Sequence, residues 1–323
     1  MRWPAVWLVG WACGAGVVTL DGQGEDSSFE GESASPPERD DSGGSLGSSS
    51  GFDPSFEDHL MQSGRADLVA AGGVGGGVPA STDHDPVVFI HGNGDRAVGG
   101  PLGGWTRPLE AYAAAGWDPA RLFAVTWGPA DPLMASQQTH GRVNIKVVRG
   151  FLEAVLDYTG AEKVDVVSHS MGVTLARIAI AGGTATDGQG TYGLGPALTE
   201  RVDAFIGIAG ANLGLSSCWA TGGWVPTCGR VEGLWPGTRY GLGPVAGRSS
   251  VLEALTRVPG VEGTRRYALW SRSDEILGPG ALVWGEVTAR LPAQTGEDVL
   301  FGLGHLESRD ETTDVQLGWL DHP

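Results

Sequence analysis

Ser170 has the surroundings of a catalytic nucleophile. It stands in Ser168-His-Ser-Met-Gly172, which matches the Gly-x-Ser-x-Gly pattern except that serine replaces the first glycine. In that pattern a tight turn from a strand to a helix exposes the serine hydroxyl, and small residues on either side let strand and helix pack closely. Residues 163–167, Lys-Val-Asp-Val-Val, predict the strand, and residues 174–180 predict the helix. The alternative is a serine in an ordinary strand–helix turn.

A nucleophilic serine needs a histidine base and an acid that orients the base. In hydrolases with this turn the three residues follow in the order Ser, Asp or Glu, His. Two histidines follow Ser170, and His322 is the penultimate residue, where chains fray. We therefore expect His305 to be the base. Asp274 directly follows a predicted strand and is the expected acid, with Glu275 as the alternative.

Two other polar residues are assigned no part in the triad. Asp203 precedes its predicted strand and would lie at the wrong end of a sheet. His169 is the neighbour of the nucleophile in the turn, so it cannot easily reach around to act as its base. We expect His169 to pack or to form a hydrogen bond.

A possible oxyanion hole follows the first predicted buried strand, in His91-Gly-Asn-Gly-Asp95. In serine hydrolases of this layout, a backbone N–H after the His-Gly pair joins the N–H that follows the nucleophile. This assigns the N–H groups of Asn93 and Met171. A glycine turn that merely closes a strand is the alternative.

Elements that could position these residues alternate between strands and helices. Short segments rich in apolar residues predict strands at 86–90, 121–126, 163–167, 204–208 and 266–270. A helical stripe of apolar residues predicts a helix at 142–158, and further helices are expected at 174–180 and 311–320. Such alternation favours an α/β fold with a mostly parallel sheet and helices on both faces. We place this single catalytic domain at residues 61–323.

Four segments together resemble the class 2 lipases, an α/β-hydrolase family of bacteria and nematodes. They are Phe89–Asp95, Thr126–Leu133, Val164–Arg177 and Gly207–Asn212. The resemblance covers about residues 85–320 and implies the α/β-hydrolase fold and carboxylic-ester hydrolysis.

In this family the triad positions correspond to Ser170, Asp274 and His305, and Cys218 and Cys228 match a pair of cysteines. We expect a lipid or other apolar ester as substrate, and no cofactor or metal. Extracellular polyhydroxybutyrate depolymerase is a more distant relative, so a polyester substrate is the alternative. A non-catalytic binding homologue would need a triad member to be missing, and none is.

Charge is concentrated near the beginning of the chain. The 323 residues carry 21 Lys and Arg against 38 Asp and Glu, a net charge of −17, which disfavours a nucleic-acid partner. Residues 21–60 alone hold eleven acids and the single base Arg39. This segment is rich in Gly and Ser, and we expect it to be a disordered linker.

The first 20 residues resemble a secretory signal peptide, with Arg2 before an uncharged apolar run. A retained membrane anchor is the alternative. An exported protein could join Cys218 to Cys228, which lie ten residues apart. Cys13, at the end of the apolar run, resembles a lipoprotein attachment site and could tether the enzyme to a membrane. An ordinary cleaved signal is the alternative, so we expect a secreted protein or a cell-envelope lipoprotein.

A long strand-poor segment at residues 211–248 contains Trp219, Trp224, Trp235 and Tyr240. Aromatic rings of this kind suit the boundary between water and an apolar surface. The segment could form a lid or an aromatic rim. Alternatively, the rings bury a Gly-rich loop that has little other core.

Overall fold

The structure is a computed structural model that describes residues 51–321. These residues belong to one compact unit built on a seven-stranded sheet in the order β1-β3-β2-β4-β7-β10-β13. Its strands are β1 Gly73–Val74, β2 Val87–Ile90, β3 Leu122–Val125, β4 Val164–His169, β7 Val202–Ile208, β10 Arg265–Ser271 and β13 Gly296–Leu300. The other strands form antiparallel pairs: β5 Gly183–Asp187 with β6 Gly190–Gly195, β8 Thr238–Arg239 with β9 Val245–Ala246, and β11 Leu282–Val283 with β12 Glu286–Val287.

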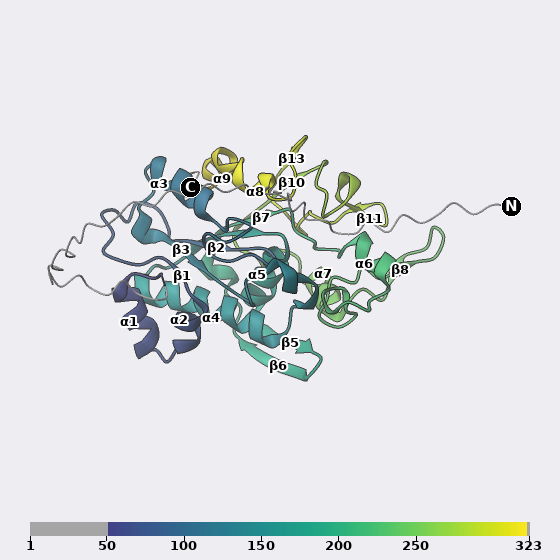
Figure 1. Ribbon diagram of the computed structural model, residues 1–323, viewed down its shortest axis with the longest axis horizontal. Coiled ribbons are helices and arrows are strands. Elements are labelled where there is room, and N and C mark those ends of the chain that lie inside the picture. The colour runs from purple at the N-terminus through teal and green to yellow at the C-terminus, as the bar shows by residue number, and fades with distance from the viewer. Residues whose placement is uncertain (1–50, 322–323) are drawn as a thin grey trace, which may run out of the picture. The chain divides into compact units, whose positions relative to one another are not determined.

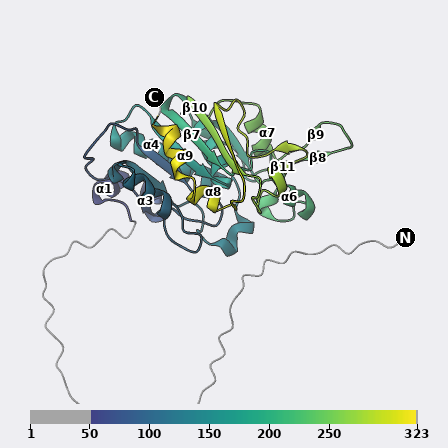
Figure 2. The same ribbon diagram turned by 90° about the horizontal axis from the view of Figure 1, so that it is seen from above.

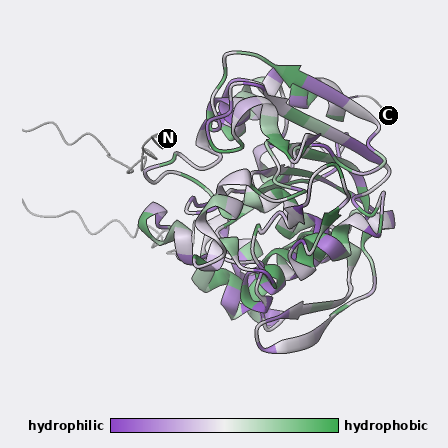
Figure 3. Ribbon diagram, turned by 90° about the vertical axis from the view of Figure 1, so that its right-hand side faces the viewer, coloured by the Kyte–Doolittle hydropathy of each residue, from purple (hydrophilic) through white to green (hydrophobic). Residues whose placement is uncertain are grey.

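Five of the six strand pairings in this sheet are parallel, and only β1 pairs with its neighbour β3 in the antiparallel direction. Strands β2, β3 and β4 are buried along their whole length, which the continuous apolar runs of β2 and β3 predicted. In Figure 3 the strands inside the molecule are largely in the hydrophobic colour. Because the parallel strands share one direction, they all end at the same edge of the sheet, which we call the carboxyl edge.

Helices cover both faces of the sheet, which confirms the α/β prediction. The helices are α1 Pro54–Gln62, α2 Ala66–Ala71, α3 Thr106–Ala114, α4 Arg142–Thr159, α5 Met171–Ala181, α6 Ser216–Thr221, α7 Ser250–Thr256, α8 Glu307–Asp310 and α9 Thr313–Leu320. Short 3-10 turns are η1 Pro119–Arg121, η2 Pro132–Gln137, η3 Thr199–Arg201, η4 Pro226–Cys228 and η5 Pro279–Ala281. Helices α3, α8 and α9 pack together over one face, and α4 and α5 lie on the other (Figure 1).

The folded unit begins earlier than the sequence predicted. Helix α1 lies within the span assigned to the linker, so the predicted boundary at residue 60 is wrong. Asp53 caps the helix by accepting a hydrogen bond from the Ser55 N–H, and Pro54 occupies the first turn. Phe56 and Leu60 are fully buried, with Phe56 against Phe123. These two apolar side chains, spaced four residues apart among acids, anchor the helix to the core.

The predicted signal peptide at 1–20, the linker up to residue 50 and Cys13 lie outside the described residues. Within residues 51–321 there is no helix of the length and apolarity that crossing a membrane requires.

The segment at 211–248 leaves the carboxyl edge after β7 and contains α6, η4 and the β8–β9 pair. A disulfide joins Cys218 to Cys228, which confirms the predicted pairing. Thr227 Oγ1 donates to the carbonyl oxygen of Ala135 at 2.6 Å, so the segment is fixed to the η2 turn that follows β3. From above, the β8–β9 hairpin projects beyond α7 and α6 (Figure 2).

Candidate active site

Ser170 occupies the turn between β4 and α5, where the sequence predicted it. Its backbone has φ 54° and ψ −127°, a left-handed conformation that non-glycine residues rarely adopt. The Ser170 N–H donates to the Ile208 carbonyl oxygen at 2.8 Å, which ties the turn to the adjacent strand β7. Strain of about 1–3 kcal/mol at such a position persists only where the surroundings enforce it. The turn thus presents the Ser170 side chain, which is partly exposed, at the carboxyl edge.

Close packing at the turn explains the small residues around Ser170. A Cβ atom on Gly172 would lie 2.3 Å from the His91 carbonyl oxygen, so only glycine fits there without movement. Ser168 takes the place of the first glycine of the pattern. It is fully buried, and its hydroxyl donates to the Ile206 carbonyl oxygen at 3.1 Å. The serine hydroxyl is therefore accommodated by the neighbouring strand.

Asp274 and His305 form a buried hydrogen-bonded pair. His305 Nδ1 lies 2.7 Å from Asp274 Oδ2, and the two residues are 6% and 1% exposed. Asp274 Oδ1 accepts hydrogen bonds from the N–H groups of Ile276 and Leu277 at 2.9 and 2.8 Å. Because a carboxylate accepts, the proton of a neutral His305 lies on Nδ1 and the lone pair on Nε2. This is the tautomer that a general base needs.

Two side chains form hydrogen bonds with the backbone of His305, one at its N–H and one at its carbonyl oxygen. Glu275, the alternative acid in the sequence analysis, accepts a hydrogen bond from the His305 N–H at 3.0 Å through Oε2. His169 Nε2–H donates to the His305 carbonyl oxygen at 3.1 Å, and the two imidazole centroids are 4.6 Å apart. Burial holds the pKa of His169 well below its usual value, so the ring is neutral. His169 therefore forms a hydrogen bond, as predicted, and Glu275 contacts the backbone of His305.

The loop after β2 reaches Ser170. A Cβ atom on Gly92 would lie 2.9 Å from Ser170 Cβ, so only a glycine permits this approach. Within the described chain, the N–H groups of Asn93 and Met171 donate to no hydrogen bond. Asn93 is oriented by its own amide, which donates to the Ala135 carbonyl oxygen at 2.8 Å. The turn at Ser170 and the neighbouring loop thus offer two N–H groups that donate to no other group. Among residues 51–321 no hydrogen bond joins Ser170 to His305.

His91 is a structural residue that the sequence analysis did not single out. Its Nδ1–H donates to the Gly92 carbonyl oxygen at 2.7 Å, and its Nε2 accepts from the Trp127 N–H at 3.0 Å. The Trp127 indole N–H donates in turn to the His91 carbonyl oxygen at 2.9 Å, and the rings stack 4° from parallel. Burial lowers the pKa of His91 to about 3, so the ring stays neutral. This pair holds the loop that carries Asn93.

One group of acids could hold a metal ion among residues 51–321, and it lies away from this site. Asp85, Asp165 and Asp203 bring carboxylate oxygens within 4.8 Å of one another. Asp203 is near the beginning of β7, and Asp165 pairs with Val87 at the beginning of β2. The cluster is therefore at the amino-terminal edge of the sheet, opposite Ser170.

One known family matches most of the chain. Residues 84–318 match the model of the family described as Lipase (class 2). The protein belongs to the class 2 lipase family. This member of the family has the α/β-hydrolase fold that its sheet order and strand directions display.

Individual relatives of this class 2 lipase are distant. It is 30% identical over 88 residues to 2-hydroxy-6-oxononadienedioate/2-hydroxy-6-oxononatrienedioate hydrolase 1 of Dechloromonas aromatica (strain RCB), a match that spans 27% of this chain and 28% of that protein. Among solved structures, Aspergillus fumigatus lipase B is 18% identical with a TM-score of 0.47, over 69% of this chain and 47% of that chain. The monoacylglycerol lipase of Paleococcus ferrophilus is 13% identical with a TM-score of 0.44, over 75% and 97%.

Proposed function

We propose that this class 2 lipase is a serine carboxylic-ester hydrolase with Ser170 as nucleophile, His305 as base and Asp274 as acid. The observation that carries the proposal is the buried 2.7 Å bond between Asp274 and His305 at the sheet edge where the Ser170 turn lies. The carboxylate orients His305 and stabilises the imidazolium that forms when the ring takes a proton.

The reaction has two halves. Ser170 Oγ attacks the ester carbonyl carbon while His305 Nε2 accepts the hydroxyl proton, and a tetrahedral oxyanion forms. The N–H groups of Asn93 and Met171 stabilise this negative charge. The intermediate collapses, the alcohol leaves with the proton from His305, and an acyl-enzyme remains. Water then attacks the acyl carbon with His305 as base, which releases the acid and restores Ser170.

The surface at the carboxyl edge supports an apolar substrate. Most of the large hydrophobic side chains that are exposed in the described chain follow the ends of sheet strands. They are Leu133 and Met134 after β3, Trp219, Trp224, Val231, Tyr240 and Leu242 after β7, Ile276 and Leu282 after β10, and Phe301 after β13. Apolar side chains that are exposed in the segments after these strands suit contact with an apolar substrate. A lipid ester at a lipid–water boundary fits this edge, and an apolar polyester is the competing substrate.

Export is part of the same proposal. The disulfide between Cys218 and Cys228 is compatible with an oxidising compartment. If Cys13 carries lipid, the enzyme would be tethered to a membrane, and otherwise it would be secreted. Intact mass and detergent partitioning of the mature protein from its native host distinguish the two outcomes.

The activity is tested with the purified full chain on p-nitrophenyl esters of increasing acyl length, a triglyceride emulsion and polyhydroxybutyrate. Ser170→Ala should lower hydrolysis by about 10³-fold or more, because the attacking hydroxyl is lost. Ser168→Ala, a matched change two residues away in the same turn, should have a far smaller effect. Equal losses in the two variants would contradict the assignment. A wild-type chain that hydrolyses none of the three would support a non-catalytic binding protein.

A further inference from the structure

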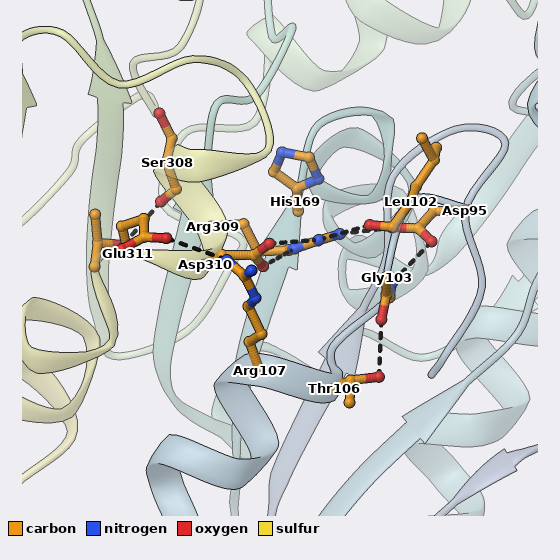
Figure 4. A network of polar contacts seen from close by, with 12 residues as sticks. Asp95, Leu102, Gly103, Thr106, Arg107, His169, Ser308, Arg309, Asp310 and Glu311 are labelled. Carbon is orange, nitrogen blue, oxygen red and sulfur yellow. Dashed lines mark hydrogen bonds and ion pairs between the residues drawn. The ribbon is translucent and has the colours of Figure 1, made fainter. Parts of the chain in front are cut away.

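A buried ion pair joins Asp95, in the loop after β2, to Arg309, in helix α8. Arg309 Nη1 donates to Asp95 Oδ2 at 2.6 Å, and the two side chains are 0% and 2% exposed. Arg309 also contacts the carboxylate of Asp310, through Nε–Oδ1 at 2.6 Å and Nη2–Oδ2 at 3.1 Å. Figure 4 shows the guanidinium between Asp310 on one side and Asp95 with Leu102 on the other, close to His169.

The two partners belong to the two segments that carry catalytic groups. Asp95 comes two residues after Asn93, and Arg309 comes four residues after His305 in helix α8. The pair therefore joins parts of the chain that are 214 positions apart. A change in its geometry would move residues 91–95, which carry the Asn93 N–H and which we call the oxyanion loop, relative to His305.

Further hydrogen bonds make the connection rigid. Asp95 Oδ1 accepts from the N–H groups of Arg96 and Gly104 at 2.8 and 3.1 Å, which closes the loop at residues 95–104. Arg309 Nη2 donates to the Leu102 carbonyl oxygen within the same loop at 2.9 Å. The planar guanidinium thus contacts this loop at two points, a geometry that the single ammonium group of lysine cannot reproduce.

Stability alone gives little reason for such a pair. Burying two charges costs several kcal/mol for each ion, and replacing a buried pair with apolar groups is often neutral or stabilising. Burial raises the pKa of Asp95, and the charge of Arg309 opposes that shift. The pair thus costs desolvation free energy without a clear gain in stability. What it does provide is a connection between the oxyanion loop and the segment that carries His305.

We propose that Asp95 and Arg309 are positioning residues that fix the position of His305 relative to the oxyanion loop. The proposal rests on the ester-hydrolase function above. Because a misplacement of about 1 Å can cost about 100-fold in rate, loss of the pair should lower kcat by about 10- to 100-fold. KM for a short ester should change little, since neither side chain needs to contact substrate.

The test compares two buried ion pairs in the full chain. The double variant Asp95→Asn/Arg309→Met removes both charges of the pair. Asp310 then loses its contact with Arg309, but its side chain is 15% exposed and can be hydrated. The control is Arg177→Met/Glu262→Gln, which removes another pair whose side chains are both 0% exposed and 2.6 Å apart. The partners of Arg177 are Glu262, Asn212 and Leu255, all outside the oxyanion loop and the His305 segment.

Two readouts separate positioning from folding. Turnover is measured per active serine, counted by titration with a phosphonate ester, so unfolded protein does not enter the rate. The low-field proton resonance of His305 Nδ1–H, identified by its loss in His305→Asn, reports the Asp274–His305 bond without any need for turnover. Melting temperatures measure stability in the same samples.

The expected result is a loss of about 10- to 100-fold in turnover per active serine, with a broadened or shifted His305 resonance, in the Asp95/Arg309 variant only. Arg309→Lys, which keeps the charge without the planar fork, should lose less. Wild-type turnover and an unchanged resonance in the Asp95/Arg309 variant would overturn the inference even if it melts earlier. Absence of esterase activity in the wild type would instead refute the proposed function, and the resonance would still test the positioning.

Discussion

Replacing Asp274 with asparagine tests the catalytic pair most directly. Asp274 Oδ1 accepts two backbone N–H bonds, and Oδ2 accepts the His305 Nδ1–H at 2.7 Å. An asparagine in the same place keeps its single oxygen on the backbone N–H groups, which leaves the amide NH₂ facing His305 Nδ1. Two donors cannot share a hydrogen bond, so His305 takes the other tautomer, with its proton on Nε2. That nitrogen can then no longer accept the proton of Ser170.

The magnitude follows from the loss of the general base. A comparable carboxylate-to-amide change in a serine-hydrolase triad lowers kcat by about 10⁴. We expect a fall of about 10³- to 10⁴-fold in Asp274→Asn, which corresponds to about 4–5.5 kcal/mol of activation free energy. The fold should persist, because asparagine has nearly the same volume as aspartate and therefore fits the same buried site, where Asp274 is 1% exposed.

The assay is kcat/KM for a soluble p-nitrophenyl ester, with circular dichroism to verify folding. Glu275→Gln is the matched control. Its side-chain oxygen can still accept the His305 N–H, so the loss should stay within about tenfold, or about 1.4 kcal/mol. A larger loss in Glu275→Gln than in Asp274→Asn would refute the assignment and make Glu275 the acid.

Three further perturbations have expected outcomes. Gly172→Ala would place Cβ 2.3 Å from the His91 carbonyl oxygen, so it should destabilise the fold by about 1–3 kcal/mol or more and lower kcat, measured by thermal melting and ester hydrolysis; a wild-type melting temperature and rate would contradict the packing. Burial raises the pKa of Asp165 to about 7. Between about pH 4 and 7 the carboxyl group therefore keeps its proton in the folded protein and loses it in the unfolded chain. The free energy of unfolding falls over that range as pH rises. Asp165→Asn should therefore be the more stable protein above pH 7, by at most about 4 kcal/mol in denaturant titrations, and should lose this advantage near pH 4. Replacing Cys218 and Cys228 with serine should cost about 2–3 kcal/mol on the chain-entropy model, seen as a lower melting temperature, and an unchanged melting temperature would contradict this.

The amino-acid sequence by itself determined the local features of the site. The turn at Ser170 could be predicted because it depends on neighbouring residues: an apolar strand before it, a helix after it and small residues where the two crowd together. Strands β2 and β3 could be predicted for a similar reason, since burial on both faces favours the continuous apolar runs that they contain. The choice of His305 and Asp274 required only chain order and the position of Asp274 after a strand, and the 2.7 Å contact agrees with it.

Only the tertiary structure decided which polar residues support these groups. Glu275 is adjacent to Asp274 in the chain, yet its carboxylate accepts from the His305 backbone 30 positions away. His169 reaches the carbonyl oxygen of His305 across 136 positions, and Asp95 reaches Arg309 across 214. A hydrogen bond requires donor and acceptor within about 3 Å and in line, and no local pattern encodes such a distance between remote segments. The packing of loops at the carboxyl edge sets it.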